Sequence, residues 1–248
     1  MEAMKAGLNV TAEGGGDLKT DLSMVLDGYT GFEHSLPIVP LYKDVVELIA
    51  RAKTYYTPTF VVSYGGQFSQ HYWRAKYDIH SDDKLRNFTP HGEIDQKGLR
   101  RTLLLDDDYH FKGIAKGAKD IVEAGGYVGL GSHGEQQGIG AHWELWMMAS
   151  GGMSNHDALR SATYTGAYSG GLQSDIGSLE TGKIADLIVL NSDPLEDIMN
   201  SIEILYVMKN GDLFDAFNLN KLTGDKAKFV PFFWVKENAQ VNSMMNLR

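Results

Sequence analysis

Short apolar runs alternate with amphipathic segments along the first 172 residues of the chain. The apolar runs are bounded by glycine or by polar residues, which is typical of short buried strands. They predict strands at residues 8–12, 29–34, 57–63 and 127–130. Apolar positions at helical spacing predict helices at residues 17–26, 42–52, 111–124, around 145–149 and 157–167. Strands that alternate with helices predict an α/β fold with a parallel sheet.

Three other segments do not follow this pattern. Residues 67–109 form an insertion that is rich in charged and aromatic residues, with little periodic apolar signal. Such an insertion after a strand is either a lid or substrate-binding loop, or a surface excursion. Residues 173–220 predict a small β module, with a strand at 184–190 and a hairpin that turns at Asn210-Gly211. The tail, 221–248, carries an apolar patch at 229–235 that we expect to pack on the domain.

Composition excludes several classes of protein. A net charge of −9 over 248 residues argues against a nucleic-acid partner, which needs a basic surface. The absence of cysteine excludes disulfides and thiolate metal sites, so any metal must bind to histidines and carboxylates. The chain has no run of 18 apolar residues, so no membrane span is expected. The first residues also lack the pattern of a signal peptide, and the compartment stays open.

The stretch Tyr127 to Gly134 combines a buried strand with a polar end. Gly129-Leu-Gly131-Ser-His-Gly134 matches the G-x-G-x-x-G pattern of dinucleotide sites. That pattern requires an acidic residue about 20 residues later, at the end of a second strand, and the next strand-like run here begins only at Ile184. We therefore favour the other interpretation, in which His133 is a metal-binding or acid–base histidine at the end of a strand.

The carboxyl-terminal part of the sequence resembles a known family. The segments 158–163 and 177–190, followed by Asp193-Pro-Leu195, are similar to the signature of the amidohydrolase superfamily, in the imidazolonepropionase-like and TolB-associated subgroup. The resemblance implies a (β/α)8 barrel with a flanking β-sandwich. Residues 1–172 would then be the carboxyl-terminal half of that TIM-like barrel, strands five to eight. The family binds one or two divalent metal ions at the strand ends, and we expect zinc, with manganese or iron as alternatives.

The same resemblance assigns roles to three residues. His34, in Glu33-His34, matches the metal-binding histidine of the sixth strand. His133 occupies the position of the eighth-strand aspartate, and Glu13 that of the fifth-strand histidine. A carboxylate and a histidine have thus exchanged places, and both can bind a divalent ion. We expect Glu13, His34 and His133 as metal ligands, with His133 and Glu13 as the catalytic residues.

Three further residues are candidates for substrate binding. Tyr64 follows a predicted strand, where its hydroxyl could donate a hydrogen bond to a tetrahedral intermediate. His142 and Glu144 lie where the family has the loop after strand eight. The alternatives are structural, because a strand-end histidine can be a satisfied core residue, Glu13 can pair with a lysine, and His142 and Glu144 can cap a helix.

These observations predict a metal-dependent hydrolase of C–N bonds that acts on a small molecule through metal-activated water. Amides, cyclic imides and dipeptide-like compounds are the expected substrates. The first-strand His-x-His of the family does not occur in the sequence. We therefore expect either a homo-oligomer or a missing amino-terminal half-barrel. The alternative function is a truncated or degenerate barrel half that has no independent activity and needs a partner chain to complete the site.

Overall fold

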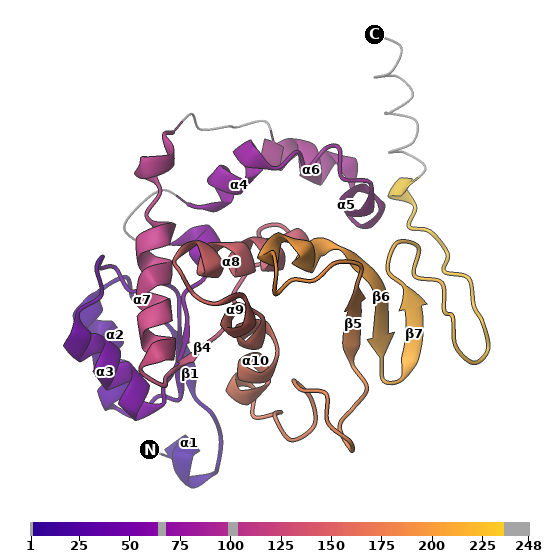
Figure 1. Ribbon diagram of the computed structural model, residues 1–248. Helices are drawn as coiled ribbons and strands as arrows, with labels where there is room; N and C mark the ends of the chain where they lie inside the picture. The colour runs from indigo at the N-terminus through magenta and orange to yellow at the C-terminus, as the bar shows by residue number, and fades with distance from the viewer. Residues whose placement is uncertain (1, 64–67, 99–103, 236–248) are drawn as a thin grey trace.

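A four-stranded parallel sheet forms the centre of the amino-terminal part of the protein. The computed structural model describes residues 2–63, 68–98 and 104–235 (Figure 1). The strands lie in the order β1-β2-β3-β4, and each pairs with the next in parallel orientation. This arrangement confirms the predicted α/β fold with a parallel sheet. The strands are β1 (Thr11–Glu13), β2 (Gly31–Glu33), β3 (Tyr55–Thr57) and β4 (Tyr127–Val128).

Helices cover one face of this sheet. After the short α1 (Glu2–Lys5), helices α2 (Leu18–Leu26), α3 (Lys43–Ala52) and α7 (Phe111–Glu123) lie on the same side of the strands (Figure 1). The carboxylate of Asp17 accepts the N–H of Thr20 at 3.0 Å, which explains why α2 begins where it does. α3 ends at Lys53, whose φ of 56° turns the chain toward β3.

The strand register separates an apolar face from a polar one. Phe32, Tyr56 and Val128 are each no more than 2% exposed and belong to the core under the helices. The rings of Phe32 and Tyr56 stack with their centroids 5.0 Å apart. Because side chains alternate along a strand, the neighbouring positions face the other side of the sheet. There Thr11 donates its hydroxyl to the Glu33 carboxylate at 2.8 Å.

The third strand lies earlier than we predicted. The sequence favoured residues 57–63, but β3 ends at Thr57 and Phe60–Val62 form a 3₁₀ turn, η1. Pro58 has no N–H to donate, and Thr59 has a φ of 50°, so the chain leaves the sheet direction at this point. The apolar run is buried as expected, although in a turn, because burial alone does not distinguish a short strand from other buried segments.

The described part of the insertion is helical and contributes to the core. It consists of α4 (Gln70–Lys76), α5 (Asp83–Phe88), α6 (His91–Gly98) and η2 (Asp106–Asp108). Ile79, Leu85 and Ile94 are all buried in the main hydrophobic cluster. The ring of Trp73 lies 5.1 Å from that of Trp146 in α8 (Ile139–Ser150). The insertion therefore packs on the domain, across the helices that follow β4 (Figure 1).

The segment after α8 differs from the prediction in one detail. The single helix expected at 157–167 consists of two, α9 (Asn155–Ala162) and α10 (Tyr164–Ser169). Thr163 lies between them with φ −122° and ψ −94°, outside the helical region. Ser154 caps α9, because its hydroxyl accepts the N–H of Asp157 at 3.1 Å.

A small antiparallel sheet follows. It contains β5 (Leu187–Leu190), β6 (Ile204–Lys209) and β7 (Asp212–Asp215), with η3 (Ile198–Ile202) between the first two strands. Asn210 and Gly211, with φ of 51° and 83°, form the predicted hairpin turn. In the described part of the tail, the indole N–H of Trp234 donates to the carbonyl of Asn87 at 3.2 Å.

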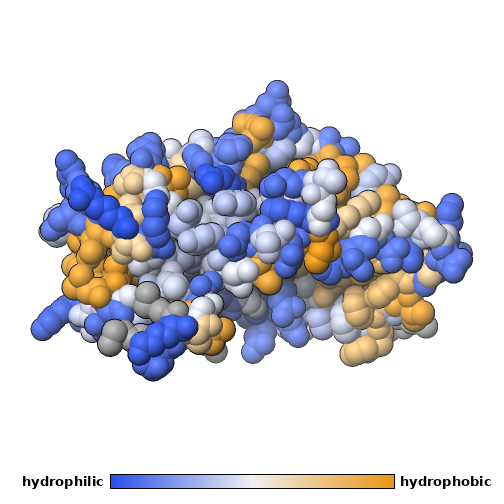
Figure 2. Space-filling model, turned by 90° about the horizontal axis from the view of Figure 1, so that it is seen from below, coloured by the Kyte–Doolittle hydropathy of each residue, from blue (hydrophilic) through white to orange (hydrophobic). Residues whose placement is uncertain are grey.

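The surface is mixed in character. Seen from below, it consists mainly of hydrophilic residues with separate hydrophobic patches (Figure 2). Exposed apolar side chains include Leu8, Leu26 and Leu179. Among the residues described here, no helix has the length and apolar character needed to cross a membrane.

Candidate active site at the carboxyl edge of the sheet

Parallel strands bring their carboxyl ends to one edge of the sheet. In the register, Glu13 lies opposite Glu33, and Glu33 lies opposite Thr57. His34 directly follows β2, and residues 129–133 lead away from β4. Polar groups from four chain segments are thus brought to the same edge of the sheet, which is where α/β enzymes bind their ligands.

The structure brings together the three residues predicted as metal ligands. His34 Nε2 lies 3.6 Å from Glu13 Oε1, and the rings of His34 and His133 have centroids 5.4 Å apart. The side chain of His34 is 8% exposed, whereas those of Glu13 and His133 are 77% and 44% exposed. His34 therefore lies at the base of this group, with the other two open to a ligand.

Three residues at this edge have left-handed backbone conformations. His34 has a φ of 73°, Thr59 of 50° and His133 of 55°. This region is unfavourable for most residues other than glycine, more so for β-branched residues such as Thr59 than for histidine, and a non-glycine residue in it costs about 1–3 kcal/mol. Strain of this kind persists where the surrounding structure enforces it, and it occurs often at active sites.

A buried aspartate holds the loop that follows Glu13. The N–H of Gly14 donates to the Glu33 carbonyl at 2.8 Å, and the N–H of Gly15 donates to the Asp21 carboxylate at 2.8 Å. Asp21 is 1% exposed, and burial raises the pKa of its carboxyl group. A Cβ at Gly14 would lie 2.9 Å from the Glu33 carbonyl oxygen, so this close approach requires glycine. Asp21 was missed because its position in an amphipathic helix suggested only a surface residue.

The insertion supplies cations to the segment that carries His133. Nδ1 of His133 lies 3.4 Å from the Glu135 carboxylate. Arg74 donates to the carbonyl oxygen of Glu135 at 3.3 Å, and Lys97 donates to the same oxygen. Arg74 is 8% exposed, and burial lowers the pKa of its guanidinium. No local sequence signal could have placed these residues here, because they lie 36 to 61 residues before His133 and Glu135.

The glycines of the G-x-G-x-x-G match have a packing explanation. A Cβ at Gly129 would lie 1.6 Å from the hydroxyl oxygen of Tyr55. At Gly131 it would lie 2.6 Å from both Thr57 Cγ2 and Thr59 Oγ1. These glycines therefore make room for side chains of β3 and the turn after it, which agrees with our preference against a dinucleotide site.

Glu144 and His142 make their hydrogen bonds with η1 and η3. Glu144 is fully buried, and its carboxylate accepts the N–H groups of Phe60 at 3.1 Å and Val61 at 2.8 Å. Burial raises its pKa to about 8, against the opposing effect of these two hydrogen bonds. Nδ1 of His142 lies 3.1 Å from the Ser201 hydroxyl in η3. Tyr64 falls outside the described residues.

His142 is expected to make the folded protein sensitive to acid. Burial, and then the charge of Lys84, lower its pKa from 6.5 to about 4, so the folded state favours the neutral imidazole. Stability from this group is therefore complete above pH 6.5 and is lost as the pH falls toward 4. Denaturant titrations over this range should show a smaller loss for His142→Gln. An equal loss in the variant would contradict this assignment.

The donor types at the edge suit a divalent ion. Imidazole nitrogens and carboxylate oxygens bind zinc, manganese and iron. Within residues 2–63, 68–98 and 104–235, no group of three or more histidine, aspartate or glutamate side chains has the arrangement of a metal site. Glu13 and His34 approach each other, while Nδ1 of His133 is directed to Glu135.

The fold and the positions of Glu13, His34 and His133 define an α/β protein with polar residues gathered at the carboxyl ends of parallel strands. The family model of the amidohydrolase family matches residues 1–214. The chain therefore belongs to the amidohydrolase family, as the resemblance implied. No curated protein matches the sequence.

Solved structures show the same fold. A Xaa-Pro dipeptidase with bound methionine in its active site superposes with a TM-score of 0.58 and 24% identity, over 86% of this chain and 46% of that one. For molinate hydrolase the TM-score is 0.59 and the identity 20%, over 88% and 45%. A putative prolidase from Bifidobacterium longum gives 0.56 and 21%, over 98% and 53%. The chain spans about half the length of these proteins.

Proposed function

We propose that this protein is a metal-dependent hydrolase of C–N bonds, with Glu13, His34 and His133 forming a metal site at the carboxyl edge of the sheet. The observation that carries the proposal is the proximity of these three side chains, with Glu13 Oε1 3.6 Å from His34 Nε2. They come from three separate strand ends and were selected by their match to the family's ligand positions. Membership of the amidohydrolase family supports hydrolysis independently.

The four-stranded sheet has the order expected for half of a (β/α)8 barrel. Its strands are consecutive neighbours, all parallel, with helices on one face and polar residues on the other. We propose that these strands correspond to strands five to eight of such a barrel. In a closed barrel the polar face would point inward, and the carboxyl edge would surround the substrate.

Each residue of the edge has a distinct role in this proposal. A zinc-class ion, when bound, would polarise the substrate carbonyl and lower the pKa of water. His34, at the base, would hold the ion. Glu13 is the most exposed of the three and is free to turn toward a substrate or the ion. His133 would move the proton to the leaving nitrogen, and Glu135 would orient its ring through Nδ1.

The expected substrates are small molecules with an amide-like bond. The structural neighbours include a Xaa-Pro dipeptidase, molinate hydrolase and phenylurea hydrolase B. We propose that this chain acts on compounds of the same kind. A panel of a proline-ending dipeptide, molinate and a phenylurea therefore provides the first activity test.

Metal content of the purified chain tests the proposal directly. We expect at least about one half-equivalent of bound zinc, manganese or iron per chain after dialysis, measured by elemental analysis. His34→Asn should reduce this content, because asparagine accepts the left-handed φ of 73° but replaces the imidazole ligand. His156→Asn is the matched control, because the His156 side chain is 73% exposed.

Two outcomes would contradict this assignment. A chain that retains no divalent ion would remove metal-dependent hydrolysis from consideration. Equal metal content in His34→Asn and His156→Asn would remove His34 from the site, whatever the total content is.

A further inference from the structure

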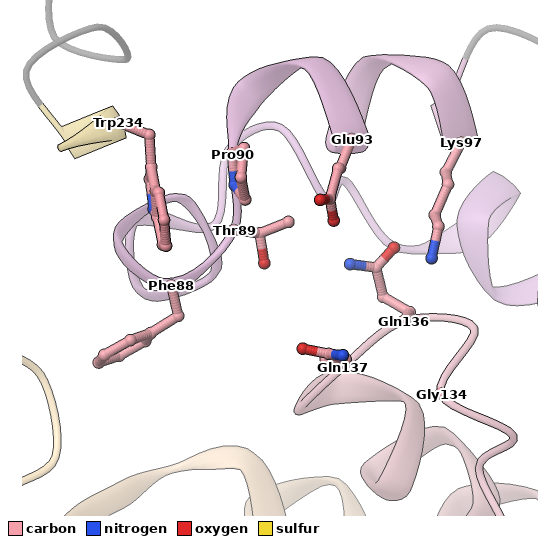
Figure 3. Close-up of a pocket in the computed structure, with 9 residues that line it drawn as sticks. All are labelled: Phe88, Thr89, Pro90, Glu93, Lys97, Gly134, Gln136, Gln137 and Trp234. Atoms are coloured by element: carbon pink, nitrogen blue, oxygen red, sulfur yellow. The ribbon is translucent and has the colours of Figure 1, made fainter. Parts of the chain in front are cut away.

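A small pocket lies next to the candidate active site. It has a volume of about 270 Å³ and lies between α6 and the loop that follows His133 (Figure 3). This size is just below that of most ligand sites, which enclose about 300–1,000 Å³, and it suits a molecule of the size of an amino acid. Gly134, which directly follows His133, forms part of the wall, so the pocket and the candidate site share one loop.

Opposite charges lie on the helix side of the pocket. Glu93 and Lys97 are one turn apart on α6, and both line the cavity. The Lys97 ammonium group donates to the Glu135 carbonyl, which uses one of its three donors and leaves others for a ligand. The carboxylate of Glu93 points into the open space (Figure 3). A ligand with both a cationic and an anionic group would match this pair.

A buried amide provides a second, independent sign of a ligand. Gln136 is 2% exposed, and its side-chain oxygen has no hydrogen-bond partner among the described residues. A buried acceptor without a donor costs about 1–3 kcal/mol, so such groups are normally satisfied. The Gln136 side chain lies at the pocket between Glu93 and Lys97, with its amide nitrogen on the side of Glu93 and its oxygen on the side of Lys97 (Figure 3). A ligand N–H group would supply the missing donor.

The other side of the pocket is aromatic. Phe88 and Trp234 line it, away from Lys97 (Figure 3). The indole N–H of Trp234 is already used, because it donates to the Asn87 carbonyl, and the ring stacks on Phe232 with centroids 4.4 Å apart. The indole is thus fixed in place, and what it offers a ligand is apolar surface.

We propose that this pocket binds an α-amino acid with an apolar side chain. The carboxylate would bind to Lys97, and the ammonium group would donate to Glu93. Rotation of the Gln136 amide by half a turn would bring its unpaired oxygen to the same ammonium group. The side chain would lie against Phe88 and Trp234. Charge, unpaired acceptor and apolar wall each match one part of such a molecule, and all three are present in one cavity.

The pocket's place beside His133 gives this binding a role in the reaction. An amino acid is a product when the C–N bond of a peptide-like substrate is hydrolysed, so the pocket would hold that part of the substrate. This role rests on the proposed function, whereas the binding itself requires neither metal nor turnover. The two can therefore be tested separately.

Calorimetric titration of the full chain with L-phenylalanine, in the presence of a chelator, tests the binding. We expect saturable binding to one site. Phenethylamine, which lacks the carboxylate, and 3-phenylpropionate, which lacks the ammonium group, should each bind at least about tenfold more weakly, as expected for losing a charged hydrogen bond.

Charge variants identify the pocket as the site. Lys97→Met should weaken phenylalanine binding about tenfold and leave phenethylamine binding unchanged, because only the former has a carboxylate. Glu93→Gln should weaken the binding of phenethylamine and leave the binding of 3-phenylpropionate unchanged, because only phenethylamine has an ammonium group. Lys97→Arg retains the charge and should preserve binding. Lys19→Met and Glu196→Gln, at exposed positions outside the pocket, are the controls.

The outcomes separate this proposal from the proposed function. Absence of saturable binding, or binding that Lys97→Met leaves unchanged, would overturn the pocket assignment. Phenylalanine binding by a chain that retains no metal would support the pocket and contradict the metal-dependent hydrolase. Metal retention without amino-acid binding would support the metal-dependent hydrolase and contradict the pocket assignment.

Discussion

Replacing His133 by asparagine is expected to lower kcat/KM for a hydrolysed C–N substrate by about 10²–10⁴-fold. The proposed role of this imidazole is proton transfer to the leaving nitrogen, and positioned acid–base groups contribute factors of this size. Asparagine accepts the φ of 55° at this position, so the substitution removes the proton-transfer group with little change in backbone strain. Steady-state kinetics on the best substrate of the panel measures the effect.

Glu135→Gln provides the comparison for this experiment. The amide keeps the size of the side chain and a hydrogen-bonding group near His133 Nδ1, 3.4 Å away in the wild type, but it removes the charge. We expect a smaller loss in kcat/KM than for His133→Asn, because the proposed role of Glu135 is to orient the ring without contact with the substrate. Wild-type kinetics in the His133→Asn variant would show that another residue moves the proton.

Glu144→Ala is expected to have the largest effect on stability, lowering the free energy of unfolding by about 3–5 kcal/mol. The substitution leaves the N–H groups of Phe60 and Val61 buried without an acceptor, each worth about 1–3 kcal/mol, and creates a cavity in the core. Urea denaturation followed by circular dichroism measures the change. Glu196→Ala, at an exposed position, should change stability by less than about 0.5 kcal/mol.

The pH dependence identifies the carboxyl group behind this effect. The pKa of Glu144 rises from 4.5 to about 8 on folding, so the folded state favours the protonated form. Its contribution to stability is complete below pH 4.5 and is lost as the pH rises toward 8. Glu144→Gln, which does not titrate, should lack this part of the pH dependence. A variant with an unchanged profile between pH 5 and 8 would show that Glu144 is already ionised in the fold.

The sequence predicted the order of strands and helices because burial and periodicity are local signals. It misplaced the third strand because Phe60–Val62 is a buried apolar run that forms a turn. The backbone of this turn is held by Glu144, which lies 83 residues away from Val61. A contact over that distance leaves no trace in the local pattern. For the same reason the broken helix at Thr163 and the packing of the insertion could not be seen in advance.

Part of the candidate site could also be predicted from local signals in the sequence. Glu13, His34 and His133 lie at the end of short predicted strands or just after them, and parallel strands must end on one edge, so their proximity followed from the fold. Glu144 was interpreted as a possible substrate-binding residue because α8 resembles the family's loop region, whereas its partners are backbone groups of η1. The contacts of Arg74 and Lys97 with Glu135 could not be predicted, because they depend on the path of the insertion, which has no periodic apolar pattern.

The left-handed conformations at His34, Thr59 and His133 also limit how this protein could change during evolution. Most amino acids would add strain at these positions, and glycine, asparagine, aspartate and histidine are the residues found most often in this region. Of these, aspartate and histidine offer a strong metal-binding group. Related enzymes that keep this backbone are therefore expected to vary between histidine and aspartate at positions 34 and 133, if these bind metal as proposed, while new substrate preferences would arise in the insertion and in the pocket beside it.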